Sequence, residues 1–222
     1  AGMTGSEEMK ASGAKDTANE CFEGFSRAMF KFNHALDGAI FEPVAKGYRS
    51  LPQGIRQGTS NVVSNLRSLL TFSNNVLQGD FRAAGNTAGR FVVNTTVGVL
   101  GVWDPASSLF GLEASGKEDF GQTLGHWGVG QGAYLVLPFI GPSTTRDAVG
   151  FVTDTLAFDP ISYINNVRGR NQVRIMQFID ARTELLNASS IIDEASLDPY
   201  AFQRDAYLQY REAQVNDNTK NT

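Results

Sequence analysis

The chain is poor in the residues on which disulfide scaffolds and most metal sites depend. Its single cysteine, Cys21, allows neither an intrachain disulfide nor a cysteine metal centre. Only two histidines are present, His34 and His126, and a metal site built from both would need carboxylates that the sequence does not identify. We therefore predict no metal and no cofactor.

Basic charge and enzyme signatures are also scarce. The net charge is -4 and the isoelectric point is about 5.2, which argues against a nucleic-acid binder, because such proteins usually present a basic face. The chain has no Gly-x-Ser-x-Gly elbow, no phosphate-binding Walker loop and no His-Glu-x-x-His motif. We predict that the protein is not an enzyme. A hydrolase triad assembled in space around Ser26, Ser143 or Ser162 stays open as an alternative.

Formal charge is missing from one long stretch of the chain. Residues 120–145 hold six glycines, two prolines and no charged side chain apart from His126, although 19% of all residues are charged. A transmembrane helix needs roughly 20 mostly apolar residues without repeated breakers. Here the longest apolar run is Tyr134–Ile140, which contains Pro138. A segment too apolar for a water-facing loop and too broken to span a bilayer indicates a protein that handles lipid.

The length of 222 residues suits one domain. We predict a flexible tether over residues 1–21, a single helical domain over 22–213 and a disordered polar tail over 214–222. The 15 phenylalanines can fill a core or insert at a membrane boundary.

Hydrophobic spacing predicts a mainly α fold. Apolar residues three to four positions apart indicate a helix over 22–41 and a second helix that ends at Gly79, with Asp80 capping a third. Amphipathic helices of this kind can pack on one another or lie in a bilayer interface, and periodicity does not choose between the two.

The second half of the chain has further helix signals. We expect a helix over about 144–157 with Ser143 as its cap, and another from Asp198-Pro199 to about Glu212. Residues 171–187 predict an amphipathic helix whose apolar face consists of Val173, Met176, Ile179 and Leu186. Strand signals are weak and are limited to Val97–Trp103 and Tyr134–Phe139.

Three alternating glycines, Gly128, Gly130 and Gly132, lie within the uncharged stretch and give backbone that can adopt positive φ. Two interpretations stay open. The glycines can form a plain long hairpin turn, or they can be a hinge that lets the apolar arm Tyr134–Phe139 move against neighbouring helices.

Specific motifs resemble those of a known family. The run Glu23-Gly24-Phe25-Ser26-Arg27-Ala28-Met29-Phe30-Lys31-Phe32-Asn33 closely resembles the opening motif of the MlaA/VacJ family of outer-membrane lipoproteins. The likeness is densest in DFGQTLGHWGVG at 119–130, closes on DPY at 198–200 and RDAY at 204–207, and covers about residues 22–212 in family order. Ser26 stands where the family usually has Asn, and Glu20-Cys21-Phe22 replaces its Asp-Pro-Leu. The family's lipidated cysteine is not in the chain, so an anchor is inferred from the resemblance.

The resemblance implies a ring-shaped bundle of amphipathic helices around a central amphipathic channel, with a glycine-rich hairpin. Proteins of this kind sit in the inner leaflet of the outer membrane, on its periplasmic side. They remove phospholipid from the outer leaflet, pass it to a soluble periplasmic carrier and are held by trimeric outer-membrane porins. A porin-docking envelope protein without transport remains an alternative.

The resemblance also implies a set of channel and gating residues. By family analogy the hairpin spans about Val97–Pro138, with the three glycines as its hinge. Phe32 and Asn33 lie in the motif where perturbation is expected to alter gating. The predicted lipid-channel and gating residues are Phe32, Asn33, Val97, Gly128, Gly130, Gly132, Tyr134 and Leu137.

Overall fold

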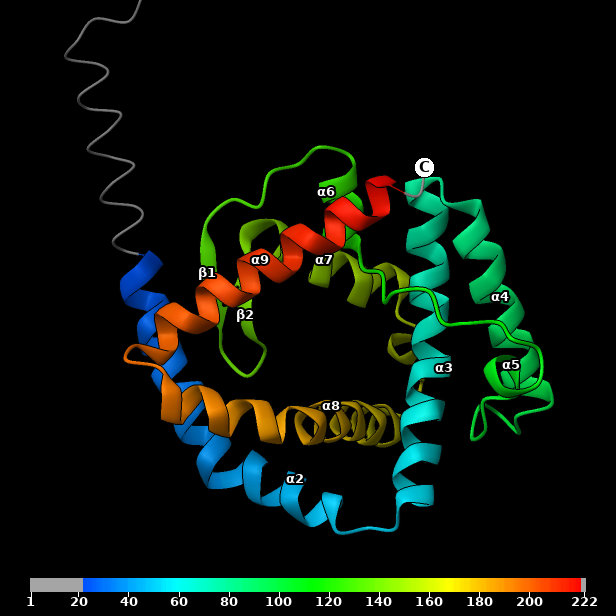
Figure 1. Ribbon diagram of the computed structural model, residues 1–222, viewed down its shortest axis with the longest axis horizontal. Helices are drawn as coiled ribbons and strands as arrows, with labels where there is room; N and C mark the ends of the chain where they lie inside the picture. The colour runs from blue at the N-terminus through cyan, green and yellow to red at the C-terminus, as the bar shows by residue number, and fades with distance from the viewer. Residues whose placement is uncertain (1–21, 221–222) are drawn as a thin grey trace, which may run out of the picture.

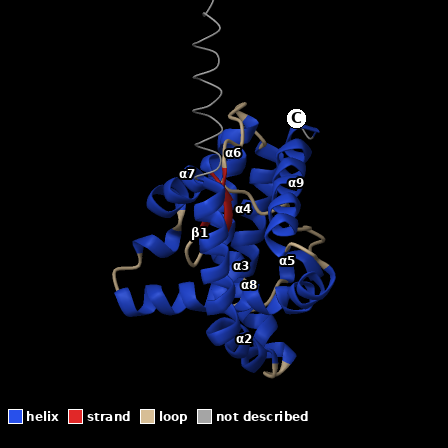
Figure 2. Cartoon of the chain, turned by 90° about the vertical axis from the view of Figure 1, so that its left-hand side faces the viewer, coloured by secondary structure: helices blue, strands red, loops and turns tan. Residues whose placement is uncertain are grey.

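The computed structural model describes residues 22–220, with side chains except those of 187–195 and 217–220. The expected tether over 1–21 lies outside the described residues. The helices follow one another around a ring, so the predicted mainly α architecture is confirmed (Figure 1). Strand structure in the described chain is limited to one short antiparallel pair (Figure 2).

The first helix covers residues 22–36 and continues through a π-helical turn, η1 (Asp37–Phe41), into α2. Pro43 lies in the first turn of α2, directly after the π-helical turn, and within this continuous helical run it removes one backbone donor. The elements that follow are α2 (Glu42–Arg49), α3 (Gln53–Gln78), α4 (Phe81–Thr96), α5 (Pro105–Ser108), α6 (Phe120–His126), β1 (Tyr134–Leu137), β2 (Gly141–Thr144), α7 (Thr145–Thr153), the π-helical η2 (Asp154–Phe158), the 3-10 turn η3 (Pro160–Tyr163), α8 (Val167–Ala195) and α9 (Pro199–Lys220).

Helix ends follow the local chemistry. Gly79 ends α3 in the left-handed conformation with φ of 82°, and the Asp80 carboxylate accepts a hydrogen bond from Ala83 N at 2.8 Å. Both predictions are confirmed. The expected cap at Ser143 is wrong, because β2 continues through Thr144 and the Thr144 hydroxyl accepts the bond from Asp147 N.

Two strand-like expectations need correction. Val97–Trp103 forms a turn in which Val99, Leu100 and Gly101 have positive φ. The amides of Leu100 and Gly101 bond to the carbonyls of Thr95 and Asn94, which α4 leaves without helical partners. The expected hairpin over 97–138 therefore contains this turn, α5 and α6, and the paired strands lie at 134–144.

The last two helices are longer than expected. α8 begins at Val167. Of its predicted face, Val173 and Met176 lie beside α3 and Leu186 is buried. Two further apolar residues, Phe178 and Leu185, line a cavity on another side. The predicted start of α9 is confirmed, since Asp198 accepts a bond from Ala201 N at 3.1 Å. The helix then continues to Lys220, beyond the expected end at Glu212.

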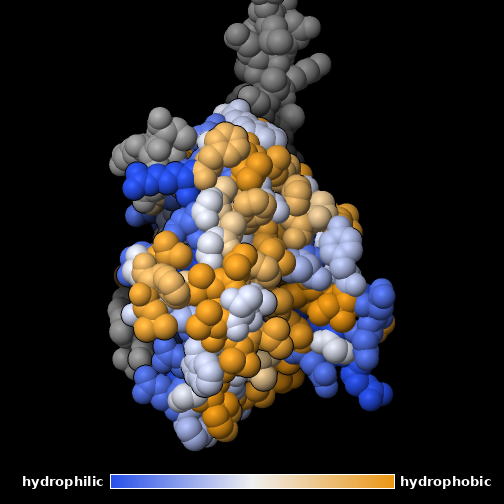
Figure 3. All heavy atoms as spheres, turned by 90° about the vertical axis from the view of Figure 1, so that its right-hand side faces the viewer, coloured by the Kyte–Doolittle hydropathy of each residue, from blue (hydrophilic) through white to orange (hydrophobic). Residues whose placement is uncertain are grey.

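Polar side chains fill much of the interior, and large apolar side chains cover much of the outside. Fully buried residues include Asn74, Gln122 and Thr123. Figure 3 shows a broadly hydrophobic face on the side of the ring that carries α4 and α5. Exposed apolar residues of these elements and of the turn between them are Phe81, Val92, Val97, Val99, Leu100, Trp103, Leu109 and Phe110. Water alone does not favour such a distribution over so large a patch.

Candidate functional site

The β1–β2 hairpin projects into the interior of the ring (Figure 1). Its strands pair Tyr134 with Thr144 and Leu137 with Gly141, leaving a tip turn of residues 138–140. Within β1, Val136 N donates to the buried Ser26 hydroxyl of the first helix at 3.2 Å. The first helix therefore holds the hairpin both along β1 and, as follows, at its tip.

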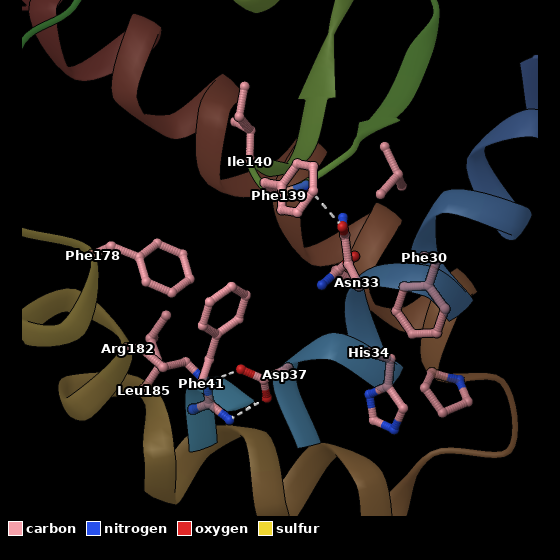
Figure 4. A pocket seen from close by; sticks show the side chains of 14 residues that line it. Phe30, Asn33, His34, Asp37, Phe41, Phe139, Ile140, Phe178, Arg182 and Leu185 are labelled. Atoms are coloured by element: carbon pink, nitrogen blue, oxygen red, sulfur yellow. Dashed lines mark hydrogen bonds and ion pairs between the residues drawn. The ribbon is translucent and has the colours of Figure 1, made fainter. Parts of the chain in front are cut away.

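Asn33 forms a double hydrogen bond with the tip. Its Nδ2 donates to Leu137 O at 2.9 Å. Its Oδ1 accepts from Phe139 N, also at 2.9 Å (Figure 4). One side-chain amide thus satisfies the backbone acceptor and donor on either side of Pro138, as a neighbouring strand would. We name this pair of bonds the Asn33 latch.

Aromatic contact and backbone strain coincide at the latch. The rings of Phe32 and Phe139 meet edge to face with centroids 5.5 Å apart. Phe139 has φ of 64°, a left-handed conformation that costs a non-glycine residue about 1 kcal/mol or more. The latch holds that residue in place, so the tip is retained by specific contacts against a local preference to relax.

A cavity of about 280 Å³, the tip cavity, lies between the first helix, the hairpin tip and α8. Most of its walls are apolar, including Phe30, Phe41 and Phe178 (Figure 4). The Arg182 guanidinium and the Asp37 carboxylate form a two-bond ion pair at 2.6 and 2.7 Å in its wall. The cavity is therefore mainly apolar with one neutralised charged patch.

A second cavity of about 280 Å³, the base cavity, lies on the other side of the hairpin tip. Its charged lining residues are Arg67, Asp119, Asp147, Asp154, Asp159 and Arg211. Ile140 lines both cavities. The tip turn thus lies where a mainly apolar space meets a space bordered by six charged side chains.

The base cavity contains a buried charge network, which we name the Arg211 staple. Arg211 of α9 donates to Asp119 at 2.7 and 2.9 Å and to Asp147 at 2.9 and 3.0 Å. Asp119 precedes α6 and Asp147 lies in the first turn of α7, so Arg211 ties together the two ends of the uncharged stretch. Tyr207 adds a hydrogen bond from its hydroxyl to Asp147 at 2.8 Å.

The network sets the ionisation of its members. Burial alone would raise the pKa of Asp119 and of Asp147, but hydrogen bonds from Arg211 outweigh it and hold both pKa values below the ordinary range. Asp154 behaves in the opposite way. Burial raises its pKa in spite of hydrogen bonds from Phe120 N and Asn74.

The structure places the predicted gating residues in three groups. Phe32, Asn33 and Leu137 meet at the tip. The second group, Tyr134 and the three glycines, belongs to β1 and the loop before it. The Tyr134 ring packs edge-on against the rings of Tyr200 and Tyr207, and its hydroxyl is buried without a hydrogen-bond partner. Val97 caps α4, which lies across the ring from the hairpin (Figure 1). These positions do not test the predicted gating roles.

The glycines differ from one another. Gly128 and Gly132 have positive φ of 89° and 72°, whereas Gly130 does not. A Cβ on Gly132 would collide with the Thr145 side chain, but a Cβ on Gly128 or Gly130 would enter open space. Gly132 is therefore fixed by packing, and any flexibility of the loop belongs at Gly128 and Gly130.

Sequence reasoning missed several residues of the two cavities. Asp37 and Arg182 gave no signal, because they pair across a long stretch of sequence. Phe139 was visible as the end of the apolar arm, but its hydrogen bond to Asn33 was not. Asp119 and Asp147 were visible as charges bordering the uncharged stretch, but only the fold shows that Arg211 joins them.

The three candidate hydrolase serines lie apart from the histidines. Ser26 accepts from Val136 N, Ser143 donates to Thr144 O, and Ser162 contacts Asp159 and Arg174. Within residues 22–220 the described side chains form no cluster of histidine, cysteine and carboxylates suited to a metal ion. None of the described helices is both long and apolar enough to cross a membrane.

A match to a family model shows which family the chain belongs to. The model described as MlaA lipoprotein matches residues 18–214. The chain belongs to the MlaA lipoprotein family. The resemblance first drawn from the Glu23–Asn33 motif is thereby confirmed.

Named relatives and a solved structure agree with the MlaA assignment. The Haemophilus influenzae "Intermembrane phospholipid transport system lipoprotein MlaA" is 34% identical over 202 residues, covering 90% of this chain and 80% of the relative. The Escherichia coli K12 protein of the same name is 37% identical, covering 84% and 74%. A chain solved in work described as "Structural basis for maintenance of bacterial outer membrane lipid asymmetry" is 36% identical with a TM-score of 0.76, covering 87% of this chain and 97% of that one.

Proposed function

We propose that this protein is the outer-membrane component of a phospholipid transport system that maintains lipid asymmetry. It takes phospholipid from the outer leaflet through the interior of the ring and delivers it to a soluble periplasmic carrier. The names of the MlaA relatives support transport of phospholipid between membranes. The observation that carries the mechanism is the meeting, at Ile140, of a mainly apolar cavity and a cavity bordered by charged side chains.

A phospholipid has two apolar chains and a charged head group, so its path needs walls of both kinds. The tip cavity offers apolar wall, and the base cavity offers carboxylate and guanidinium groups. The hairpin tip lies between them. Displacement of the tip would join the two cavities into one amphipathic passage, and the Asn33 latch would control that displacement.

The surroundings of the ring follow from its apolar outer face. Exposed residues such as Leu100, Leu109 and Phe110 fit acyl chains of the inner leaflet on the periplasmic side of the outer membrane. We place the protein there, lipid-anchored and associated with a trimeric porin. In this role the protein moves lipid and performs no catalysis.

Reconstitution separates this function from its alternatives. Fluorescent phospholipid is placed in vesicles that contain porin, and its arrival on a soluble acceptor is followed with and without the protein. Transfer that depends on the protein is expected. Association with porin without any transfer would leave only a docking role, and release of fatty acid that is lost in Ser26→Ala, Ser143→Ala or Ser162→Ala would identify a hydrolase.

A further inference from the structure

Helices α3 and α4 face each other through polar side chains. Asn65 of α3 donates to the Thr95 hydroxyl at 2.9 Å, and Asn75 donates to the Thr87 hydroxyl at 3.3 Å. Polar interfaces of this kind must be satisfied internally or by a polar ligand, because each unsatisfied buried group opposes folding.

The segment between α5 and α6 closes this interface into a third cavity. Figure 1 shows the segment crossing α3 on the side toward the viewer. Ser115 shares a hydrogen bond with Thr87 at 2.9 Å, and Asn86 donates to Glu113 O at 2.7 Å. The enclosed side cavity has a volume of about 300 Å³. That size suits a polar head group better than a whole lipid.

The side cavity has an excess of positive charge. Its lining includes three cations, Arg67, Arg90 and Lys117, but a single carboxylate, Asp104. Arg90 pairs with Asp104 at 2.8 Å. Arg67 and Lys117 make no ion pair with the carboxylates of the described residues, although Arg67 also lines the base cavity, where it acts on Asp154 at longer range. Arg67 and Lys117, both exposed to solvent, thus border one small polar space without an ion-pair partner among the described carboxylates.

A buried acceptor in the same lining has no partner. Asn65 is 7% exposed; its Nδ2 is bonded to Thr95, but its Oδ1 is buried without a hydrogen bond. An acceptor left in this state is unfavourable unless a donor reaches it. The cavity therefore combines two cations for an anion with one acceptor for a hydroxyl or amine.

We propose that the side cavity binds the anionic phosphoglycerol head group of a phospholipid. Arg67 and Lys117 hold the phosphate oxygens, and Asn65 Oδ1 accepts a hydrogen bond from a glycerol hydroxyl. A zwitterionic head group brings its own cation, so it leaves part of the excess charge uncompensated and binds more weakly. Because Arg67 borders the base cavity as well, this site lies beside the lipid path. The lipid origin of the phosphate rests on the proposed function.

Calorimetry on the full chain in neutral-detergent micelles tests this site. The probes are short-chain phosphatidylglycerol, short-chain phosphatidylcholine and free sn-glycerol 3-phosphate. Phosphatidylglycerol is expected to bind about tenfold more tightly than the other two. The double variant R67Q/K117Q should lose that preference, because it removes both charged contacts. The control Lys46→Gln removes an exposed cation that pairs with Glu42 elsewhere and should keep the preference.

Each outcome has a defined meaning. Equal binding of the two lipids, or undiminished preference in R67Q/K117Q, overturns the site. Glycerol phosphate binding as tightly as the anionic lipid overturns the lipid source and leaves a phosphate site. Asn65→Asp, checked for folding by thermal melting, should weaken the anionic lipid selectively. If the parent protein shows no preference for phosphatidylglycerol but still transfers lipid from vesicle to acceptor, only this inference is refuted. If the parent protein shows the preference but transfers no lipid, only the proposed function is refuted.

Discussion

The two ends of the uncharged stretch and its middle are held by different forces. At the ends, the Arg211 staple joins Asp119 and Asp147 through four charged hydrogen bonds in a buried setting. At the hairpin tip, two neutral hydrogen bonds from Asn33 and one ring contact retain a strained residue, Phe139. Charged bonds that are buried and paired are costly to break, whereas neutral bonds each contribute about 1 kcal/mol. We therefore expect the Arg211 staple to keep the ends of the stretch fixed, and the hairpin tip to move more easily.

The largest expected effect is at the base. Arg211→Met leaves two buried carboxylates without their partner, which should cost about 3–5 kcal/mol of unfolding free energy. For a chain of this size the midpoint of thermal unfolding should fall by roughly 10 °C. Arg204→Met is the control, since Arg204 is more exposed and pairs only with its neighbour Asp205. Equal melting of both variants would show that the staple does not hold the base.

The three glycines of the loop before β1 should differ in how much stability their replacement by alanine costs. Gly132→Ala forces a Cβ into Thr145 at a positive φ and should destabilise the fold by roughly 2 kcal/mol. Gly128→Ala should cost about 1 kcal/mol from its left-handed backbone alone. Gly130→Ala has neither penalty, and its denaturation midpoint should match the parent protein. A large loss at Gly130 would contradict this division.

The tip should open without loss of the fold. Asn33→Leu removes both latch bonds, which amounts to about 2 kcal/mol and roughly thirtyfold in the open population. Hydrogen exchange at Phe139 N–H should accelerate accordingly, while the thermal midpoint should fall by at most roughly 4–8 °C. Asn86→Leu, which removes a bond to Glu113 O in another loop, should leave Phe139 exchange unchanged. Unaltered exchange in Asn33→Leu would mean that other contacts hold the tip.

The smallest expected effect concerns how the unfolding free energy depends on pH, because the carboxylates around the base cavity act in opposite directions. The pKa of Asp154 is raised in the folded state, so its contribution favours folding at low pH and is lost as pH rises through that pKa. Asp119 and Asp147 have lowered pKa values, so their contribution is present above about pH 4 and is lost below it. Denaturation measured at successively lower pH from pH 7 should show a slight rise in the unfolding free energy, followed by a fall. Asp154→Asn should abolish the gain and keep the loss.

The sequence predicted the helices well because their signals are local. The Gly79 stop and the Asp80 cap depend on neighbours within four residues, and the structure confirms both. The motif likeness supplied the family, and with it the ring. Contacts between segments distant in the sequence could not be predicted. The Asn33–Phe139 bond spans 106 positions and the Arg211–Asp119 bond spans 92, so no periodicity or spacing reveals them.

Two segments depart from what simple local patterns suggest. Val97–Trp103 has a weak strand signal, but its backbone turns back to satisfy the last carbonyls of α4. In α8 the predicted residues Val173 and Met176 lie beside α3, but further apolar residues, Phe178 and Leu185, line a cavity on another side. A helix in a ring that borders cavities on several sides does not confine its apolar residues to one face.

The most direct test of the account is the rate of phospholipid transfer in Asn33→Leu. The variant is compared with the parent protein in porin-containing vesicles, at a temperature where both are folded. We predict a transfer rate changed by several-fold, because the latch sets how often the tip leaves the junction of the tip and base cavities. An unchanged rate, together with accelerated exchange at Phe139, would show that the tip opens freely and does not gate the lipid path.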